Sequence, residues 1–299
     1  MSVDQAAYRP YEGTRRPGHG VVFAIAETSI RRVMRQKWIR SLTLTIVVIN
    51  VAIGAIMNIS LNTRIRNGMT VGDMIENAGG GDLDAFVMTL RGFLSMLYLF
   101  APVIAALTAG PLIAEDRRAR ALPLYFSRPI RHWQYVAGKM IAAGFFLAAM
   151  TLLPPFAVFG MEIANAPDMS QVGQRFGELL GAWVPCVLIT VALASFSLGI
   201  SSLMDRTTAA SMLVFCVVIF PVIAVNAAYG SVFTNPAWLA LDPFNSIVRI
   251  GHELLPPTAG QTIDAYDIPL ANAWQSLAGW TAAGLLMLGW RIRNVEVVT

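Results

Sequence analysis

Charged side chains are scarce in this chain: they make up only 13% of its 299 residues. A typical soluble domain is about 25% charged, so the composition argues against a surface that lies wholly in water. Hydrophobic residues make up 56% of the chain and gather in long uncharged runs. Because about 20 apolar residues in a helix cross the hydrocarbon core of a bilayer, these runs predict an all-α membrane protein embedded in lipid.

Lysine and histidine are also rare, and this argues against several kinds of chemistry. Neither Lys37 nor Lys139 follows the glycine spacing of a Walker phosphate-binding loop. The three histidines, His19, His132 and His252, are far apart and show no metal-ligand pattern. Zinc-protease and serine-nucleophile signatures are missing as well. We therefore expect that this chain is not an enzyme and that it binds neither a metal nor a cofactor.

Only two cysteines are present, Cys186 and Cys216, and both lie inside apolar runs. This position favours small buried apolar side chains over a disulfide or a pair of metal ligands. The first 20 residues are polar and lack the apolar stretch of a signal peptide. Residues 1–20 are therefore predicted to form a disordered cytoplasmic tail.

Uncharged runs bounded by charged residues predict six membrane spans, which together form a membrane domain over residues 41–290. About 20 residues suffice for one crossing, so each run can span once. The fifth run is long for one helix, and we expect its span to end near Tyr229. The runs are Ser41–Thr63, Gly92–Ala114, Met140–Met161, Leu179–Met204, Thr207–Leu241 and Ile268–Trp290.

The basic residues are unevenly divided between the two sides that six spans imply. The side with both termini, including the tail 291–299, carries all but five of the 22 lysines and arginines. By the positive-inside rule, both termini are predicted to be cytoplasmic. This division explains the net charge of +4 without a nucleic-acid partner. The five basic residues expected outside are Arg64, Arg66, Arg91, Arg175 and Arg249.

An amphipathic helix is predicted over residues 21–40, directly before the first span. Apolar residues recur there at helical spacing, and Thr28 and three arginines cover the opposite face. Such a helix is expected to lie in the cytoplasmic interface of the membrane, with its arginines near anionic lipid headgroups. This helix could serve only as a positively charged anchor that sets the topology, or it could also bind a partner protein; both interpretations stay open. The apolar residues are Phe23, Ala26, Ile30, Val33 and Met34.

Small residues and prolines shape the predicted spans. Ser195, Gly199 and Ser202 lie at helical spacing in the fourth span, where they favour close contact with another helix. Prolines interrupt four of the six spans, which fits either ordinary kinks or a bundle that switches between two packings. These prolines are Pro102, Pro154, Pro155, Pro185 and Pro221.

The connection after the fifth span is unusual. Residues 236–250 are too apolar for a loop in water and too interrupted by proline for a seventh span. An interfacial or partly re-entrant outer hairpin is predicted, with Trp238 at headgroup level.

Ionisable residues at mid-membrane depth commonly mark proton or sodium coupling. Arg91, Glu162 and Glu178 are expected only at the outer ends of spans. This argues against a secondary carrier, although backbone carbonyls can also hold coupling ions.

The connection between spans two and three has a distinctive pattern. Ile113-Ala114-Glu115 ends span two, a charged stretch and the turn Leu122 to Phe126 follow, and Ser127-Arg128-Pro129 leads to Gly138-Lys139. This segment resembles the cytoplasmic coupling segment of type-2 ATP-binding-cassette (ABC-2) transporter permeases. The six spans, the preceding helix and the outer hairpin are similar to that family over nearly the whole chain. The family commonly has Gly-Thr where this chain has Arg120-Ala121, and Pro123 interrupts the leucine run.

The resemblance implies a permease subunit of an ATP-driven ABC exporter in the bacterial inner membrane. A separate cytoplasmic ABC ATPase would hold ATP and Mg²⁺, and a second permease copy or a sister permease would complete the substrate path. A push by the ATPase on residues 115–139 would tilt spans two and three together. The coupling residues implied by the resemblance are Glu115, Arg117, Arg118, Arg120, Ser127, Arg128 and Pro129.

Other interpretations stay open. The arginines of this turn could serve only as solvated charges that set the topology. The chain could transmit force from an ATPase to an envelope partner without moving a solute, or it could be a self-contained channel or secondary carrier. A substrate-stimulated ATPase rate favours the exporter, and a tight extracytoplasmic partner favours the force transmitter. Activity that survives charge reversal at Arg117 and Arg118 favours the carrier. The substrate cannot be read from the sequence.

Overall fold

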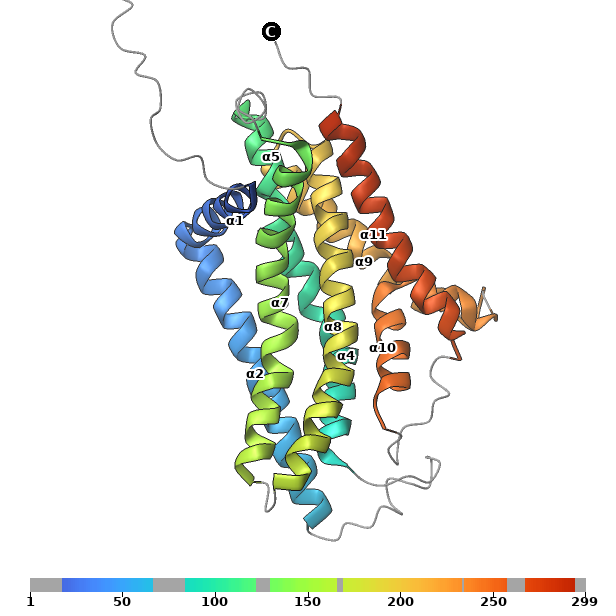
Figure 1. The fold of residues 1–299 in the computed structure, drawn as a ribbon. Helices are drawn as coiled ribbons and strands as arrows, with labels where there is room; N and C mark the ends of the chain where they lie inside the picture. The colour runs from blue at the N-terminus through green and yellow to red at the C-terminus, as the bar shows by residue number, and fades with distance from the viewer. Residues whose placement is uncertain are drawn as a thin grey trace, which may run out of the picture.

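The computed structural model describes residues 18–66, 84–121, 130–165, 169–232, 234–256 and 267–293 (Figure 1). These residues are helical apart from short connections, and no β-strand occurs among them. In chain order the elements are α1 (Gly18–Arg35), α2 (Lys37–Arg66), α4 (Ala85–Ile104), η1 (Ala105–Ala109), α5 (Pro111–Arg118), α7 (His132–Asn165), α8 (Met169–Leu203), α9 (Thr207–Ala228), η2 (Pro236–Leu241), α10 (Pro243–Leu254) and α11 (Leu270–Arg293).

Five helical stretches in the described residues are long and apolar enough to cross a membrane. The helix α11 has 24 residues but does not meet the same test. The all-α membrane class is therefore confirmed, whereas the count of six spans stays a prediction. The helix α9 ends at Ala228, next to the residue expected to end the fifth span. The five stretches are Lys37–Thr63, Ala85–Arg118, His132–Ala164, Val172–Leu203 and Thr207–Ala228.

The helices form an elongated bundle in which α2, α7 and α8 run along most of its length (Figure 1). The helices α1 and α5 and the last turn of α11 gather at one end, which we call the α1 end (Figure 1). The helix α10 lies nearer the opposite end.

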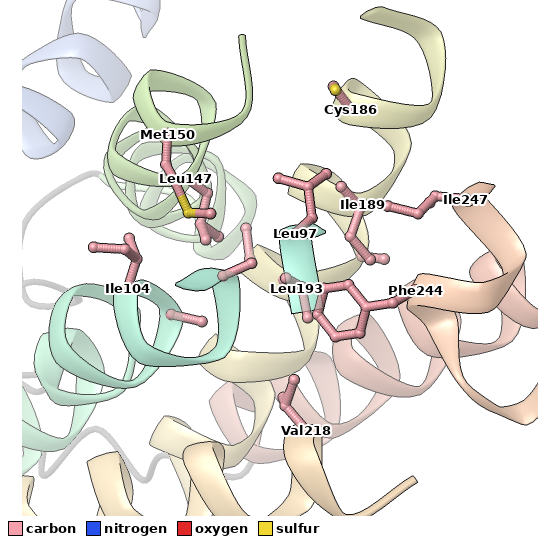
Figure 2. Close-up of a cluster of buried hydrophobic side chains, with 14 of the residues drawn as sticks. Leu97, Ile104, Leu147, Met150, Cys186, Ile189, Leu193, Val218, Phe244 and Ile247 are labelled. Atoms are coloured by element: carbon pink, nitrogen blue, oxygen red, sulfur yellow. The ribbon is translucent and has the colours of Figure 1, made fainter. Parts of the chain in front are cut away.

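The core of the bundle is apolar and draws buried side chains from α1, α2, α4, α5 and α7 to α11; Figure 2 shows one part of it. Most side chains of α4 are buried, so this helix is central. Since lipid is as apolar as these side chains, close van der Waals packing and not expulsion of water holds such helices together. The labelled core residues are Leu97, Ile104, Leu147, Met150, Cys186, Ile189, Leu193, Val218, Phe244 and Ile247.

The helices α2 and α9 present large apolar side chains to the outside, among them Ile56, Met212 and Phe220. In a bilayer such side chains contact acyl chains at no hydrophobic cost. Cys216 of α9 is also exposed, so the prediction that both cysteines are buried is wrong for Cys216 and right for Cys186. An apolar run places a residue in a span but does not tell which face of the helix it occupies.

The helices α8 and α11 touch through their backbones. A Cβ on Gly199 would lie 2.8 Å from the carbonyl oxygen of Gly284, and a Cβ on Gly284 would lie 2.4 Å from the backbone nitrogen of Phe196. Real Cβ atoms do not approach so closely, because such distances are well inside van der Waals contact. The predicted close helix contact at Gly199 is thereby confirmed.

The helix of the second span is interrupted where α4 meets α5. Pro102 removes one backbone donor, and the π-helix η1 shifts the hydrogen-bond ladder. Ser201 of α8 provides hydrogen bonds to the backbone groups at this interruption. Its hydroxyl accepts hydrogen bonds from the backbone nitrogens of Ile113 and Ala114, at 3.1 and 3.0 Å, and donates one to the carbonyl of Gly110. This break is therefore fastened to a neighbouring helix.

The connection between α9 and α11 contains a helical hairpin formed by η2 and α10. Asp242 accepts a hydrogen bond from the backbone nitrogen of Phe244 at 2.8 Å and caps α10. It also accepts one from Asn226 of α9 at 3.1 Å. The helix α10 packs on α4, α8 and α11, and Trp238 of η2 is partly exposed. The membrane depth of this predicted hairpin stays a prediction.

Of the charged residues expected at the outer ends of spans, Arg91 lies in the second turn of α4, Glu178 in the third turn of α8 and Glu162 in the last turn of α7. Arg91 is buried and donates hydrogen bonds to the carbonyls of Leu255 and Pro256, at 3.0 and 2.7 Å. Glu178 is buried and pairs with Arg175 at 2.9 Å. Arg91 thus holds the end of the hairpin against α4, whereas the Glu178 pair lies within α8.

Candidate functional site

The predicted coupling residues fall into two groups. Glu115, Arg117 and Arg118 lie on α5, which continues the helix that begins as α4, and Arg120 follows directly. The helix α7 begins at His132, so residues 132–139 of the predicted segment are already part of the next long helix. Outside the described residues lie Ser127, Arg128 and Pro129.

Asp116 is the centre of a buried ionic cluster. Its side chain is only 1% exposed and accepts hydrogen bonds from Arg32 of α1 at 2.8 Å and from Tyr135 of α7 at 2.8 Å. It forms an ion pair with Lys139 of α7 at 2.7 Å. A buried carboxylate is tolerated when it is paired and hydrogen-bonded. These contacts therefore hold α1, α5 and α7 in one fixed arrangement.

Lys139 is the buried cation of this cluster, with a side chain that is 2% exposed. Its ammonium group also donates a hydrogen bond to the backbone carbonyl of Leu112 at 3.1 Å. The same group lies 5.6 Å from the centre of the Tyr135 ring, within the range of a cation–π contact. Lys139 thus ties the start of α7 to both the side chain and the backbone of α5.

Gly138 allows α1 to lie directly on α7. A Cβ at this position would be 2.8 Å from the Cβ of Ile25 and 2.9 Å from the carbonyl oxygen of Val22. Val22 and Ile25 are buried in this contact, whereas Phe23, expected on the apolar face of this helix, is exposed. Gly138 and Lys139 therefore act together: the glycine admits α1, and the lysine neutralises Asp116. The lipid-interface position of α1 stays a prediction.

Arg117 fastens α5 to the end of α8. Its guanidinium forms an ion pair with Asp205 at 2.7 Å and donates a hydrogen bond to the carbonyl of Ser202 at 2.6 Å. Asp205 lies in the short turn between α8 and α9. Contacts at Arg117, Asp116 and Ser201 thus join α5 to three other helices.

Arg118 and Arg120 are the exposed members of the predicted set. The helix α5 ends at Arg118, and Arg120 has a φ of 51°, in the left-handed region. A side chain in that region costs about 1–2 kcal/mol, and glycine usually occupies such a position after a helix. In the ABC-2 pattern that this segment resembles, glycine is common at the position of Arg120. The left-handed turn is therefore formed with arginine in place of glycine, and the arginine adds an exposed positive charge to the turn.

None of the four members of the cluster is among the coupling residues predicted from the sequence, although Lys139 belongs to the motif that carries the resemblance; they are Arg32, Asp116, Tyr135 and Lys139. From the sequence, Asp116 is interpreted as a solvated charge of the turn between spans two and three. Arg32 is interpreted as one of the arginines of the amphipathic helix that lie near lipid headgroups. The available signal was Lys139, a lone lysine at the start of an apolar run, because such a charge needs a partner. In the described part of the chain, no three His, Cys, Asp or Glu residues form a group that could hold a metal.

The fold and its apolar helices define a multi-pass membrane protein. The family model of ABC-2 family transporter proteins matches residues 23–286, from α1 to α11, and the chain belongs to this family. The family is a transmembrane component of ABC transporters and not their nucleotide-binding subunit. The match includes the Asp116 cluster and α5. Comparison with curated proteins gives no match.

Proposed function

We propose that this chain is the permease subunit of an ATP-driven ABC exporter, coupled to a separate ATPase through the connection between α5 and α7. The observation that carries the proposal is the two-sided construction of α5. One side is fixed by Asp116 and Arg117, while Arg118 at its end is exposed. An element that is rigidly held on one side and exposed on the other is suited to receive a push and pass it on.

The contacts of α5 give the push a route into the membrane domain. Asp116 links α5 to α1 and α7, and Ser201 and Arg117 link it to α8. A displacement of α5 would therefore move α7 and α8 as well as the helix that it continues. Packed helices tend to adopt discrete arrangements, so closure of an ATPase dimer would select one of two packings.

The family and the charge distribution support the remaining parts of the proposal. The α1 end carries Arg32, Arg117 and Arg118, and by the positive-inside rule these charges support a cytoplasmic position for this end. The protein would lie in a bacterial inner membrane with both termini inside. A second copy of the chain, or a sister permease, would form the substrate path with it. ATP and Mg²⁺ would be bound by the partner ATPase.

Purification of the tagged chain from its native membranes in mild detergent, followed by native mass spectrometry, tests this proposal. We expect two permease chains and two ATPase subunits that contain a Walker phosphate-binding loop. An assembly that contains no ATPase would contradict the proposal and leave a channel or a secondary carrier. An ATPase rate that rises with an amphipathic substrate would distinguish transport from force transmission to an envelope partner.

A further inference from the structure

A cavity of about 700 Å³ lies between η2, α8 and α11 and shares no residue with the Asp116 cluster. Its volume falls within the range of about 300–1,000 Å³ that is usual for small-molecule sites. None of its twelve lining residues is charged. The cavity opens to the outside of the bundle, and its wall offers no opposite charge to pair with a charged ligand, so it favours a neutral molecule.

The wall formed by α11 changes from polar to apolar along the helix. Asn272, Gln275 and Ser276 line the cavity in its first two turns, and Gly279 and Ala283 line it in the next two. Residues at this spacing share one face of a helix. The cavity thus offers hydrogen-bonding groups at one end and apolar surface at the other.

Ser276 points to a hydrogen-bonding ligand. Its hydroxyl oxygen is buried and has no hydrogen-bond partner among the residues that the structure describes. A buried polar group without a partner costs about 1–3 kcal/mol. A ligand with a hydroxyl or an amide group in this cavity would supply the missing partner once the Ser276 side chain rotates toward the cavity.

The aromatic part of the lining comes from α8, α11 and η2 and is held in position. The rings of Phe196 and Trp280 meet edge to face, with their centres 4.4 Å apart. The indole nitrogen of Trp280 donates a hydrogen bond to the carbonyl of Leu241 at 3.3 Å, which fixes the ring. Trp238 of η2 adds a second indole to the lining. Fixed aromatic surfaces provide a large contact area for the apolar part of a ligand.

We propose that this cavity binds an uncharged amphipathic molecule, with a hydroxyl- or amide-bearing head at Asn272, Gln275 and Ser276 and an apolar body against Trp280 and Phe196. The head chemistry is common to neutral membrane lipids and to water-soluble neutral amphiphiles. The site is independent of the proposed transport function, because its occupancy can be measured without an ATPase.

The test is photo-crosslinking of the full chain in lipid nanodiscs with a diazirine-bearing diacylglycerol, which is neutral and has a hydroxyl head. We expect crosslinks in residues 236–241 or 270–284. Excess unlabelled diacylglycerol competing against the probe would identify a lipid source, and octyl glucoside below its micellar concentration would identify a soluble source. Competition by either supports the proposal, and phosphatidylglycerol, which is anionic, should not compete.

A pair of glycine variants makes the test specific. A Cβ at Gly279 or at Gly289, both on α11, would meet nothing within 4 Å, so both positions accept a larger residue. Gly279 lines the cavity and Gly289 does not. We expect Gly279→Leu to reduce crosslinking at least tenfold and Gly289→Leu to leave it unchanged. Equal labelling of both variants, labelling elsewhere only, or equal competition by phosphatidylglycerol would overturn the proposal.

Discussion

The Asp116 cluster and the η2–α11 cavity are both polar regions in an apolar protein, but they are built in opposite ways. In the cluster, each buried charge has an opposite charge from another helix within 2.8 Å. In the cavity, the polar groups are neutral, and the hydroxyl of Ser276 has no partner among the described residues. Paired buried charges fix the relative positions of helices, whereas neutral unsatisfied groups leave hydrogen-bonding capacity for another molecule.

The largest expected effect comes from removing the carboxylate at the centre of the cluster. Asp116→Ala leaves Lys139 buried without its anionic partner, which should lower the free energy of unfolding by about 3–5 kcal/mol. Chemical denaturation in detergent measures this change. Glu115→Ala is the matched control, because its partly exposed side chain lies 3.8 Å from Arg32 and should contribute less than about 1 kcal/mol.

Two further results would decide whether the charge itself matters. Adding Lys139→Met to Asp116→Ala should recover much of the lost stability, because no unpaired charge then remains buried. Equal stability of Asp116→Ala and Glu115→Ala would contradict the role given to Asp116.

The next effect comes from separating α1 from the cluster without touching a charge. Gly138→Leu places a side chain where Ile25 and the backbone of Val22 already lie, and should destabilise the protein by about 3 kcal/mol. Gly160→Leu on the same helix is the control, since a Cβ there meets nothing within 4 Å. Thermal unfolding of the two variants compares them directly. A similar loss in both would mean that α1 does not rest on Gly138.

A smaller effect is expected at the break between α4 and α5. Ser201→Ala removes the acceptor for the backbone nitrogens of Ile113 and Ala114, and should lower stability by about 2 kcal/mol. Ser202→Ala is the neighbouring control, because among the described residues its hydroxyl bonds within its own helix, to the carbonyl of Gly199. Hydrogen exchange of residues 110–114 should rise in the first variant alone. Unchanged protection after Ser201→Ala would show that the break does not depend on this serine.

The smallest effect is a stabilisation. Arg120→Gly removes a side chain from the left-handed region, and we expect a gain of about 0.5–1 kcal/mol after the greater freedom of glycine in the unfolded chain is subtracted. Arg120→Ala keeps the strain and should show no gain. A loss of stability in Arg120→Gly, measured by thermal unfolding, would mean that the arginine side chain makes a favourable contact that outweighs the strain.

The sequence predicts features that depend on composition and periodicity along one helix. The all-α class, the end of the fifth span near Tyr229 and the close contact at Gly199 follow from runs of apolar residues and small residues at helical spacing. These local patterns do not depend on which helices become neighbours, so they can be read without the fold.

The members of the Asp116 cluster could not be predicted from patterns along a single helix. Arg32, Asp116 and Lys139 are separated by long stretches of chain, and their pairing depends on how α1, α5 and α7 pack. The exposed position of Cys216 also depends on which face of α9 turns outward. Periodicity cannot distinguish a face in contact with lipid from one in contact with helices, because both are apolar.

The measurement that tests the proposed coupling most directly compares charge reversal at two exposed arginines. Tagged Arg118→Glu and Arg293→Glu, at the ends of α5 and α11, would be purified from native membranes with quantification of the ATPase retained. We predict that Arg118→Glu retains less than one-tenth of the ATPase, which corresponds to a loss of about 1.4 kcal/mol or more of binding free energy, at unchanged thermal stability. Arg293→Glu should retain the ATPase. Full retention of the ATPase by Arg118→Glu would contradict the account.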